Sequence, residues 1–321
     1  MSKIFFFSII LLAASVITMA QQTKTGSGSS QVPTFMDSLG GGKAISLYNH
    51  KVPNSKAGPS TYKELNEKGW SSKVTDPEMI PFIPEASKRT GTAIVICPGG
   101  GYSRLSTLNE GAMIANAFKN AGIAAFVLKY RLPSDSIMAD KSFGPLQDAQ
   151  QALKLVRMNA AAYGIDINKV GIIGFSAGGH LASTAATHFD TTTIANSEQT
   201  NIRPDFAMLM YPVISFGKYA HRGSRKALVG SDSIGSLAQR YSNELQVTDR
   251  TPPTFLVHAA DDKVVPVENS VLFYQALLEH KVMKSAMFIF QEGGHGFGIN
   301  NKKTKTQWFD LAIEWLKLNG F

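Results

Sequence analysis

The feature that most constrains this chain is an apolar run that leads into a serine flanked by glycines. Residues 170–175 are mostly apolar, Ser176 follows, and the stretch from Ala177 onward is rich in alanine and glycine. This pattern predicts a buried strand, a tight turn and a helix packed closely against the strand. Gly174, Ser176 and Gly178 then have the spacing of a nucleophile elbow, which exposes the serine side chain at the carboxyl end of a strand.

The rest of the chain alternates expected strands with expected helices. We expect strands over 92–97, 123–129, 206–211, 254–259 and 286–290, and helices over 108–121, 145–163, 267–279 and 306–318. Short apolar pieces over 44–84, interrupted by proline and glycine, predict antiparallel edge strands. The alternation predicts an α/β fold with a mostly parallel sheet and helices on both faces. The irregular stretch 212–253 predicts a lid or pocket wall.

The N-terminal residues have the pattern of an export signal. Residues 1–20 contain one lysine, a long apolar run and a small-x-small ending at Ala20, as in a cleaved secretory signal peptide. Residues 21–43, rich in Ser, Thr, Gly and Gln, predict a flexible linker, and residues 44–321 predict one catalytic domain. We therefore expect a secreted or periplasmic protein with no stable membrane association after cleavage.

Composition excludes several classes of function. Cys97 is the only cysteine, so no intramolecular disulfide can form. The net charge is +8, but the basic residues are spread along the chain and not interleaved with aromatics, which argues against nucleic-acid binding. No pair of histidines at helical or hairpin ligand spacing is accompanied by carboxylates, and no dinucleotide fingerprint is present. The sequence predicts an enzyme without metal or cofactor.

A serine nucleophile needs a base, and the base needs an orienting carboxylate. The expected strand 254–259 is followed by Asp261 and Asp262, and the expected strand 286–290 is followed by His295 in a glycine-rich loop. The carboxyl ends of parallel strands are where α/β sheets collect catalytic groups. The order Ser176, Asp262, His295 predicts a catalytic triad. An Asp-x-x-Val-Pro spacing selects Asp262, whereas Asp-x-x-Val alone also admits Asp261, which would otherwise stabilise the turn.

Three glycines follow the first buried strand. The segment Pro98 to Tyr102 places Gly100 and Gly101 where backbone N–H groups, together with that of Ala177, predict an oxyanion hole. The other six histidines are predicted to be structural or exposed: His180 at a helix start, His258 at a strand end, and His50, His188, His221 and His280 on the surface or in loops.

These motifs together resemble a known family. They comprise Pro98 to Tyr102, Leu128 to Pro133, Pro145 to Ala149, Gly174 to Ser183, Asp261 to Pro266 and Gly293 to Phe297. In this order they are similar to the bacterial esterase/lipase branch of the α/β hydrolases, BD-FAE-like, which includes acetylxylan and feruloyl esterases. Pro98 stands where the related hormone-sensitive-lipase branch has the histidine of a His-Gly-Gly-Gly motif.

The resemblance implies an α/β-hydrolase fold and a serine esterase that acts on an acylated carbohydrate. We expect removal of acetyl groups from plant-type polysaccharide or its oligosaccharides, with feruloyl or other carboxylesterase activity as the alternative. A prolyl-oligopeptidase-like peptidase is a second alternative, although about seventy mature residues before the first buried strand are too few for propeller blades of roughly forty residues each. A third is an inactive hydrolase fold that binds carbohydrate.

Overall fold

The computed structural model of the chain describes Met1 and residues 35–49, 51–230 and 235–321. Apart from Met1, the predicted signal peptide lies outside the described residues, as does most of the predicted linker. Within the remaining linker stretch, α1 (Phe35–Ser38) is a short helix, and Met36 is buried in the apolar core. The folded part of the chain therefore extends N-terminal to residue 44, the predicted start of the domain.

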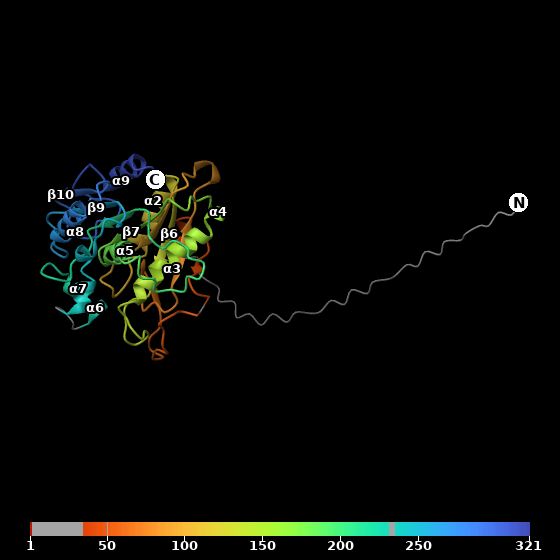
Figure 1. Cartoon of the computed structure of the whole chain (residues 1–321), viewed down its shortest axis with the longest axis horizontal. Helices are drawn as coiled ribbons and strands as arrows, with labels where there is room; N and C mark the ends of the chain where they lie inside the picture. Colours follow the sequence, from red (N-terminus) through yellow and green to blue (C-terminus); the bar gives the residue numbers. More distant parts are fainter. Residues whose placement is uncertain (2–34, 50, 231–234) are drawn as a thin grey trace. The chain divides into compact units, whose positions relative to one another are not determined.

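A mostly parallel sheet forms the centre of the described chain (Figure 1). Its strands follow the order β1-β4-β6-β5-β7-β8-β9-β10. Their bounds are β1 (Ile45–Ser46), β4 (Glu78–Phe82), β5 (Ala93–Cys97), β6 (Ala124–Lys129), β7 (Val170–Phe175), β8 (Ala207–Met210), β9 (Thr254–Ala259) and β10 (Ala286–Phe290). Strands β1 and β4 pair antiparallel, and the strands from β6 to β10 pair parallel. The predicted α/β class and the antiparallel edge strands are confirmed.

Helices cover both faces of this sheet. On one face the buried core includes residues of α3 (Gly144–Met158), α5 (Ala177–Thr187) and α8 (Glu268–Glu279). On the other face it includes residues of α2 (Met113–Asn120) and α9 (Trp308–Leu318). Since β5 and β7 are buried on both faces, their nearly continuous apolar sequences are what a central parallel strand requires.

Two helical predictions differ from the structure. The expected helix over 145–163 is divided into α3 and α4 (Ala160–Tyr163) at Asn159, whose side-chain amide donates to the Leu155 carbonyl oxygen at 2.8 Å. Such local bonds compete with the helical pattern. The expected helix over 108–121 begins as a π-helical turn, η2 (Leu108–Ala112), and continues as α2.

The irregular stretch 212–253 also contains more regular structure than its sequence indicates. It includes α6 (Arg222–Val229), α7 (Ser236–Arg240) and a 3-10 turn, η3 (Asn243–Gln246). A second short turn, η1 (Ala86–Lys88), precedes β5. These pieces are too short to show clear periodicity.

A buried ion pair joins two of the sequence motifs, Leu128 to Pro133 and Pro145 to Ala149. The Arg131 guanidinium donates to the Asp148 carboxylate from Nε and Nη2, the latter at 2.7 Å, and both side chains are fully buried. Arg131 follows β6 and Asp148 lies in α3, so the pair joins the sheet to a covering helix. Loss of either partner would leave a buried charge uncompensated, which typically costs about 3–5 kcal/mol.

A small hairpin lies outside the main sheet. Strands β2 (Leu65–Glu67) and β3 (Trp70–Ser72) pair antiparallel, with Glu67 opposite Trp70. The two-residue turn, Lys68 and Gly69, has positive φ at both positions, 46° and 85°. These angles are typical of the type I′ turn, which matches the twist of paired strands.

Candidate active site

The predicted elbow is present between β7 and α5. Ser176 has φ 52° and ψ −119°, a conformation that a non-glycine residue rarely adopts. A Cβ on Gly174 would lie 2.0 Å from the Gly178 carbonyl oxygen, and one on Gly178 would lie 2.1 Å from that of Cys97. The strand and helix therefore approach so closely that only glycine fits on either side of Ser176.

His295 and Asp262 meet Ser176 from two neighbouring strands. Strands β9 and β10 pair parallel with Ala259 opposite Phe290, so the loops that follow them emerge side by side. His295 Nε2 lies 2.8 Å from Ser176 Oγ, and His295 Nδ1 lies 2.7 Å from Asp262 Oδ2. The structure therefore joins the three predicted residues in one hydrogen-bonded chain.

Asp261 occupies a different position from Asp262. It is exposed, and its Oδ1 accepts hydrogen bonds from the Gly293 and Gly294 amides at 2.9 and 2.8 Å. Asp261 thus stabilises the loop that carries His295. In the described part of the chain it forms no hydrogen bond with the His295 imidazole. Of the two alternatives that the sequence left open, the geometry supports Asp262.

A second histidine, His258, contacts the same carboxylate. Its Nε2 lies 3.3 Å from Asp262 Oδ2 and 3.0 Å from the Val265 carbonyl oxygen, so this nitrogen faces two acceptors and carries hydrogen. Its Nδ1 pairs with the Ser270 hydroxyl at 2.8 Å. The predicted place of His258 near a strand end is correct, but no pattern in the sequence indicates its contact with Asp262.

The surroundings of Asp262 favour its ionised form. Burial by itself raises the pKa of a carboxyl group, but hydrogen bonds from His258 and His295 outweigh this effect. The amides of Val264 and Val265 also donate to Oδ1, at 2.8 and 3.0 Å. The pKa of Asp262 therefore lies well below the ordinary range of an aspartate, and the group can hold the imidazole as an anion.

The predicted oxyanion donors lie beside Ser176. Among the described residues, the Gly100 and Gly101 amides donate to no protein acceptor, and Ala177 supplies the first amide of α5, which has no intrahelical partner. Gly100 has φ 135°, and a Cβ there would lie 2.1 Å from the Arg104 carbonyl oxygen. The conformation that leaves these amides available thus requires glycine at position 100.

A buried acid that sequence analysis did not identify connects the two catalytic loops. Glu110 Oε2 accepts from the Gly99 amide and Oε1 from the Tyr211 hydroxyl, both at 2.9 Å. The Tyr211 hydroxyl oxygen accepts from the Gly298 amide at 3.1 Å. Burial raises the pKa of Glu110, while Tyr211 and Gly99 act in the opposite direction. This network joins the glycine loop after β5 to the loop that carries His295.

Ser176 and His295 open into a cleft of about 490 Å³, which is also lined by Trp70, Arg104, Asn109 and His221. His221 comes from the 212–253 stretch, so this stretch supplies part of the pocket wall, as predicted; residues 231–234 lie outside the described part. The prediction that His221 is a surface or loop residue is incomplete, because it faces the cleft. Burial first, and then the nearby His295, lower the pKa of His221.

The remaining described histidines do not line this cleft. His180 is fully buried just after the elbow and pairs with the Tyr102 hydroxyl at 2.9 Å and the Tyr241 carbonyl oxygen at 2.8 Å. Burial lowers its pKa to about 4. His188 is also buried, which the sequence did not indicate, and His280 is exposed. His50 lies outside the described residues.

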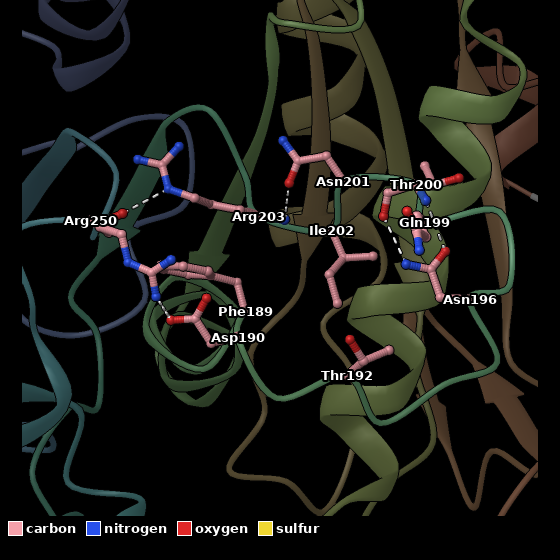
Figure 2. Close-up of a pocket in the computed structure, with 10 residues that line it drawn as sticks. All are labelled: Phe189, Asp190, Thr192, Asn196, Gln199, Thr200, Asn201, Ile202, Arg203 and Arg250. Atoms are coloured by element: carbon pink, nitrogen blue, oxygen red, sulfur yellow. Dashed lines mark hydrogen bonds and ion pairs between the residues drawn. The ribbon is translucent and has the colours of Figure 1, made fainter.

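A second cavity, of about 540 Å³, carries no comparable chemistry (Figure 2). Several of its polar side chains are already bonded within the cavity wall: Arg250 pairs with Asp190, Arg203 donates to the Arg250 carbonyl oxygen, and the Asn196 amide donates to the Thr200 carbonyl oxygen. None of the predicted site residues lines it.

In the described part of the chain, no group of three or more histidine, cysteine or acidic residues is arranged to hold a metal ion. Nor does any helix among the described residues have the length and apolar character needed to cross a membrane.

Comparison with known proteins gives relatives that share most of this domain. An acetylxylan esterase of Xylanibacter ruminicola is 36% identical over 248 residues, which are 75% of this chain and 48% of that protein. Endo-1,4-beta-xylanase B of Butyrivibrio fibrisolvens is 40% identical over 235 residues, 72% of this chain and 36% of that protein. The chain thus spans less than half the length of either relative.

Solved structures show the same fold. An acetyl ester-xyloside bifunctional hydrolase from Caldicellulosiruptor lactoaceticus has a TM-score of 0.73 at 36% identity, covering 87% of this chain and 97% of that one. The carboxylesterase Cest-2923 from Lactobacillus plantarum has a TM-score of 0.62 at 24% identity, covering 80% and 96%. The family model described as BD-FAE matches residues 81–277. With its α/β-hydrolase sheet and this match over more than half its length, the chain belongs to the BD-FAE family.

Proposed function

We propose that this protein is a serine carboxylic-ester hydrolase that removes acetyl groups from plant-type polysaccharide or its oligosaccharides. The observation that carries the proposal is the hydrogen-bonded chain from Ser176 through His295 to Asp262, beside amides with no protein acceptor in the described residues. The acetylated sugar is supported by the acetylxylan esterase relative and by the acetyl ester-xyloside hydrolase structure.

The geometry suits a two-step acyl transfer. Ser176 Oγ attacks the ester carbonyl carbon while His295 Nε2, 2.8 Å away, takes the hydroxyl proton. The carbonyl oxygen becomes an oxyanion that the amides of Gly100, Gly101 and Ala177 stabilise. When the C–O bond to the sugar breaks, His295 returns the proton to the departing hydroxyl. Water then attacks the acyl-enzyme, with His295 as base, and releases the acid.

Asp262 supports both steps without exchanging a proton. Its anionic Oδ2 holds the proton of His295 on Nδ1, so Nε2 is free to accept the proton of Ser176. It also stabilises the imidazolium that forms after the transfer. The low pKa of Asp262 keeps this carboxylate ionised at neutral pH.

The cleft does not favour glycoside hydrolysis. Retaining and inverting glycosidases ordinarily use two carboxyl groups on either side of the scissile bond. Among the described residues that line this cleft, Glu110 alone carries a carboxyl group. Both oxygens of that group already accept hydrogen bonds, from the Gly99 amide and the Tyr211 hydroxyl. We therefore assign the ester bond, and not the glycosidic bond, as the point of cleavage.

The test is acetate release, measured beside ferulate release, from acetylated and feruloylated xylan oligosaccharides. The parent protein should release acetate, and Ser176→Ala should reduce turnover more than about 10⁴-fold because it removes the nucleophile. Acetate release that survives in this variant would refute the mechanism. Ferulate without acetate would replace the acetyl group by the feruloyl alternative, and hydrolysis of a proline-containing chromogenic peptide would favour the peptidase alternative.

We also propose that the protein acts outside the cytoplasm. The composition of residues 1–20 supports export followed by cleavage near Ala20. The expected mature N-terminus is Gln21, which mass spectrometry of protein from the periplasm and the culture medium would detect. An intact N-terminus in a cytoplasmic fraction would contradict this localisation.

A further inference from the structure

The position of the β2–β3 hairpin is not explained by the core. Every residue of β2 is exposed, with Leu65 at 47%, and the hairpin is not part of the eight-stranded sheet. An isolated two-stranded hairpin is marginally stable at best in water. Its place in the molecule must therefore come from the segment to which it is attached.

The hairpin is attached to the segment that follows the glycine loop after β5, residues 98–102, which is the oxyanion loop. Ser71 and Leu105 exchange two backbone hydrogen bonds, at 3.0 and 2.7 Å, and the Leu108 amide donates to the Gly69 carbonyl oxygen at 3.0 Å. A Cβ on Gly69 would lie only 2.6 Å from Leu108 Cβ, so the contact is close. Trp70 stands between the two anchored residues, and its backbone is held from both sides.

Arg104 completes this wall of the cleft. Its guanidinium carbon lies 4.1 Å from the centre of the Trp70 ring, and both residues line the cleft with Ser176. The Arg104 amide donates to the Gly100 carbonyl oxygen at 3.2 Å, which holds its backbone against the oxyanion loop. Among the described residues, the guanidinium takes part in no hydrogen bond or ion pair, so its five N–H donors are available to a ligand.

His221, which also lines the cleft, offers a further donor. His221 Nδ1 accepts from the Ser224 amide at 3.2 Å, which leaves the hydrogen on Nε2. Nε2 has no hydrogen-bond partner in the described part of the chain. His221 Cε1 would lie 3.8 Å from a Cβ on Gly101, so this side chain lies close to the oxyanion loop.

We propose that Trp70 and Arg104 form a glycan subsite that binds a pyranose ring of the esterified carbohydrate next to the scissile ester. A pyranose presents apolar C–H faces and, at its rim, hydroxyl and ring oxygens. Because the Arg104 guanidinium lies over one face of the Trp70 indole, the C–H face packs on the indole surface that Arg104 leaves open, and the oxygens accept from the guanidinium. A long acyl chain would instead require a mostly apolar lining. This proposal rests on the proposed function, because it names how the same cleft recognises the sugar.

The experiment compares two esters in four proteins. The parent, Trp70→Ala, Arg104→Ala and the control Arg240→Ala are assayed on monoacetylated xylotriose and on 4-nitrophenyl acetate. Arg240 also stacks on an aromatic ring, that of Phe143 at 5.2 Å, but it does not line the cleft. Thermal unfolding verifies that each variant folds. If an alanine variant does not fold, the milder substitution at the same position, Trp70→Phe or Arg104→Lys, is assayed in its place.

We expect each subsite variant to lose about tenfold or more in kcat/KM on the xylotriose ester. For Arg104→Ala the reason is the loss of a hydrogen bond from a charged group, and for Trp70→Ala it is the loss of apolar surface buried against the indole ring. The loss should appear mainly in KM, because binding of substrate and transition state weakens alike. The aryl ester has no sugar, so the ratio of the two specificity constants should fall at least about fivefold. Arg240→Ala should match the parent on both esters.

The outcomes separate this proposal from the function on which it rests. Equal losses on both esters, or an unchanged KM on xylotriose ester, would overturn the subsite and leave the esterase assignment standing. A parent that hydrolyses the aryl ester but no acetylated glycan would overturn the sugar substrate and the subsite together. A parent that hydrolyses neither ester would overturn the esterase assignment itself.

Discussion

Replacement of Asp262 by asparagine tests the arrangement of the catalytic loops most directly. Asparagine keeps the oxygen that accepts from Val264 and Val265, so the turn is retained. It places an amide nitrogen where Oδ2 faces His295 Nδ1 at 2.7 Å. This nitrogen donates hydrogen, so Nδ1 of His295 becomes the acceptor and the ring proton moves to Nε2. An imidazole protonated on Nε2 cannot take the proton of Ser176.

The magnitude follows from the tautomer. A triad in the wrong tautomer loses about 10⁴-fold in kcat, which corresponds to about 5 kcal/mol of activation free energy. The free energy of unfolding should change by much less than this activation free energy, because His258 Nε2 keeps its bond to the Val265 carbonyl oxygen at 3.0 Å. We expect a loss of about 1–3 kcal/mol in the free energy of unfolding. The assay is hydrolysis of 4-nitrophenyl acetate at neutral pH, with urea unfolding in parallel.

Asp261→Asn is the matched control. The asparagine oxygen can still accept from the Gly293 and Gly294 amides, so kcat should fall less than about tenfold. An Asp262→Asn variant that retains more than a tenth of parental kcat would refute the reasoning. So would a folded Asp261→Asn variant as inactive as Asp262→Asn.

Three further predictions concern stability. Gly178→Ala should lower the free energy of unfolding by more than about 3 kcal/mol, because its Cβ would lie 2.1 Å from the Cys97 carbonyl oxygen; the control Gly217→Ala, whose nearest neighbour is the Ser215 hydroxyl at 3.3 Å, should lose far less in the same urea titration. Tyr211→Phe removes the hydroxyl between Glu110 and Gly298 and should lower the free energy of unfolding by about 1–3 kcal/mol. The same substitution should lower kcat more than it raises KM. An unchanged free energy of unfolding would contradict the network. Because the pKa of Asp262 is lowered in the folded state, its stabilising contribution is complete above the unfolded value of about 3.9 and is lost as the pH falls. The stability difference between the parent and Asp262→Asn should therefore shrink in acid, and a difference that stays constant from pH 6 to about pH 2 would contradict it.

The parts that sequence predicted well are those in which one local pattern carries the information. The apolar run before Ser176 and the glycines around it predict the elbow, since strand, turn and helix follow directly along the chain. Asp262 and His295 each follow a recognisable strand, and parallel strands bring such positions to one edge of the sheet. The Asp-x-x-Val-Pro spacing even selected the aspartate that contacts His295.

The parts that sequence missed depend on contacts between distant segments. Glu110 and Tyr211 are 101 residues apart, and no local pattern indicates that the two side chains meet. His258 is the last residue but one of an ordinary buried strand, so its pairing with Asp262 follows from the turn geometry alone. Trp70 belongs to a strand of three residues, which is too short for periodicity to identify.

The attachment of the β2–β3 hairpin makes the shape of one cleft wall independent of the geometry of the catalytic residues. Its three anchoring bonds join main-chain atoms, so apart from Gly69, where a Cβ would lie 2.6 Å from Leu108 Cβ, they place few demands on side-chain identity. Substitutions at the other hairpin positions therefore need no repacking of the sheet and no displacement of Ser176. The surface that Trp70 presents to the cleft can therefore change while Ser176, His295 and Asp262 keep their geometry.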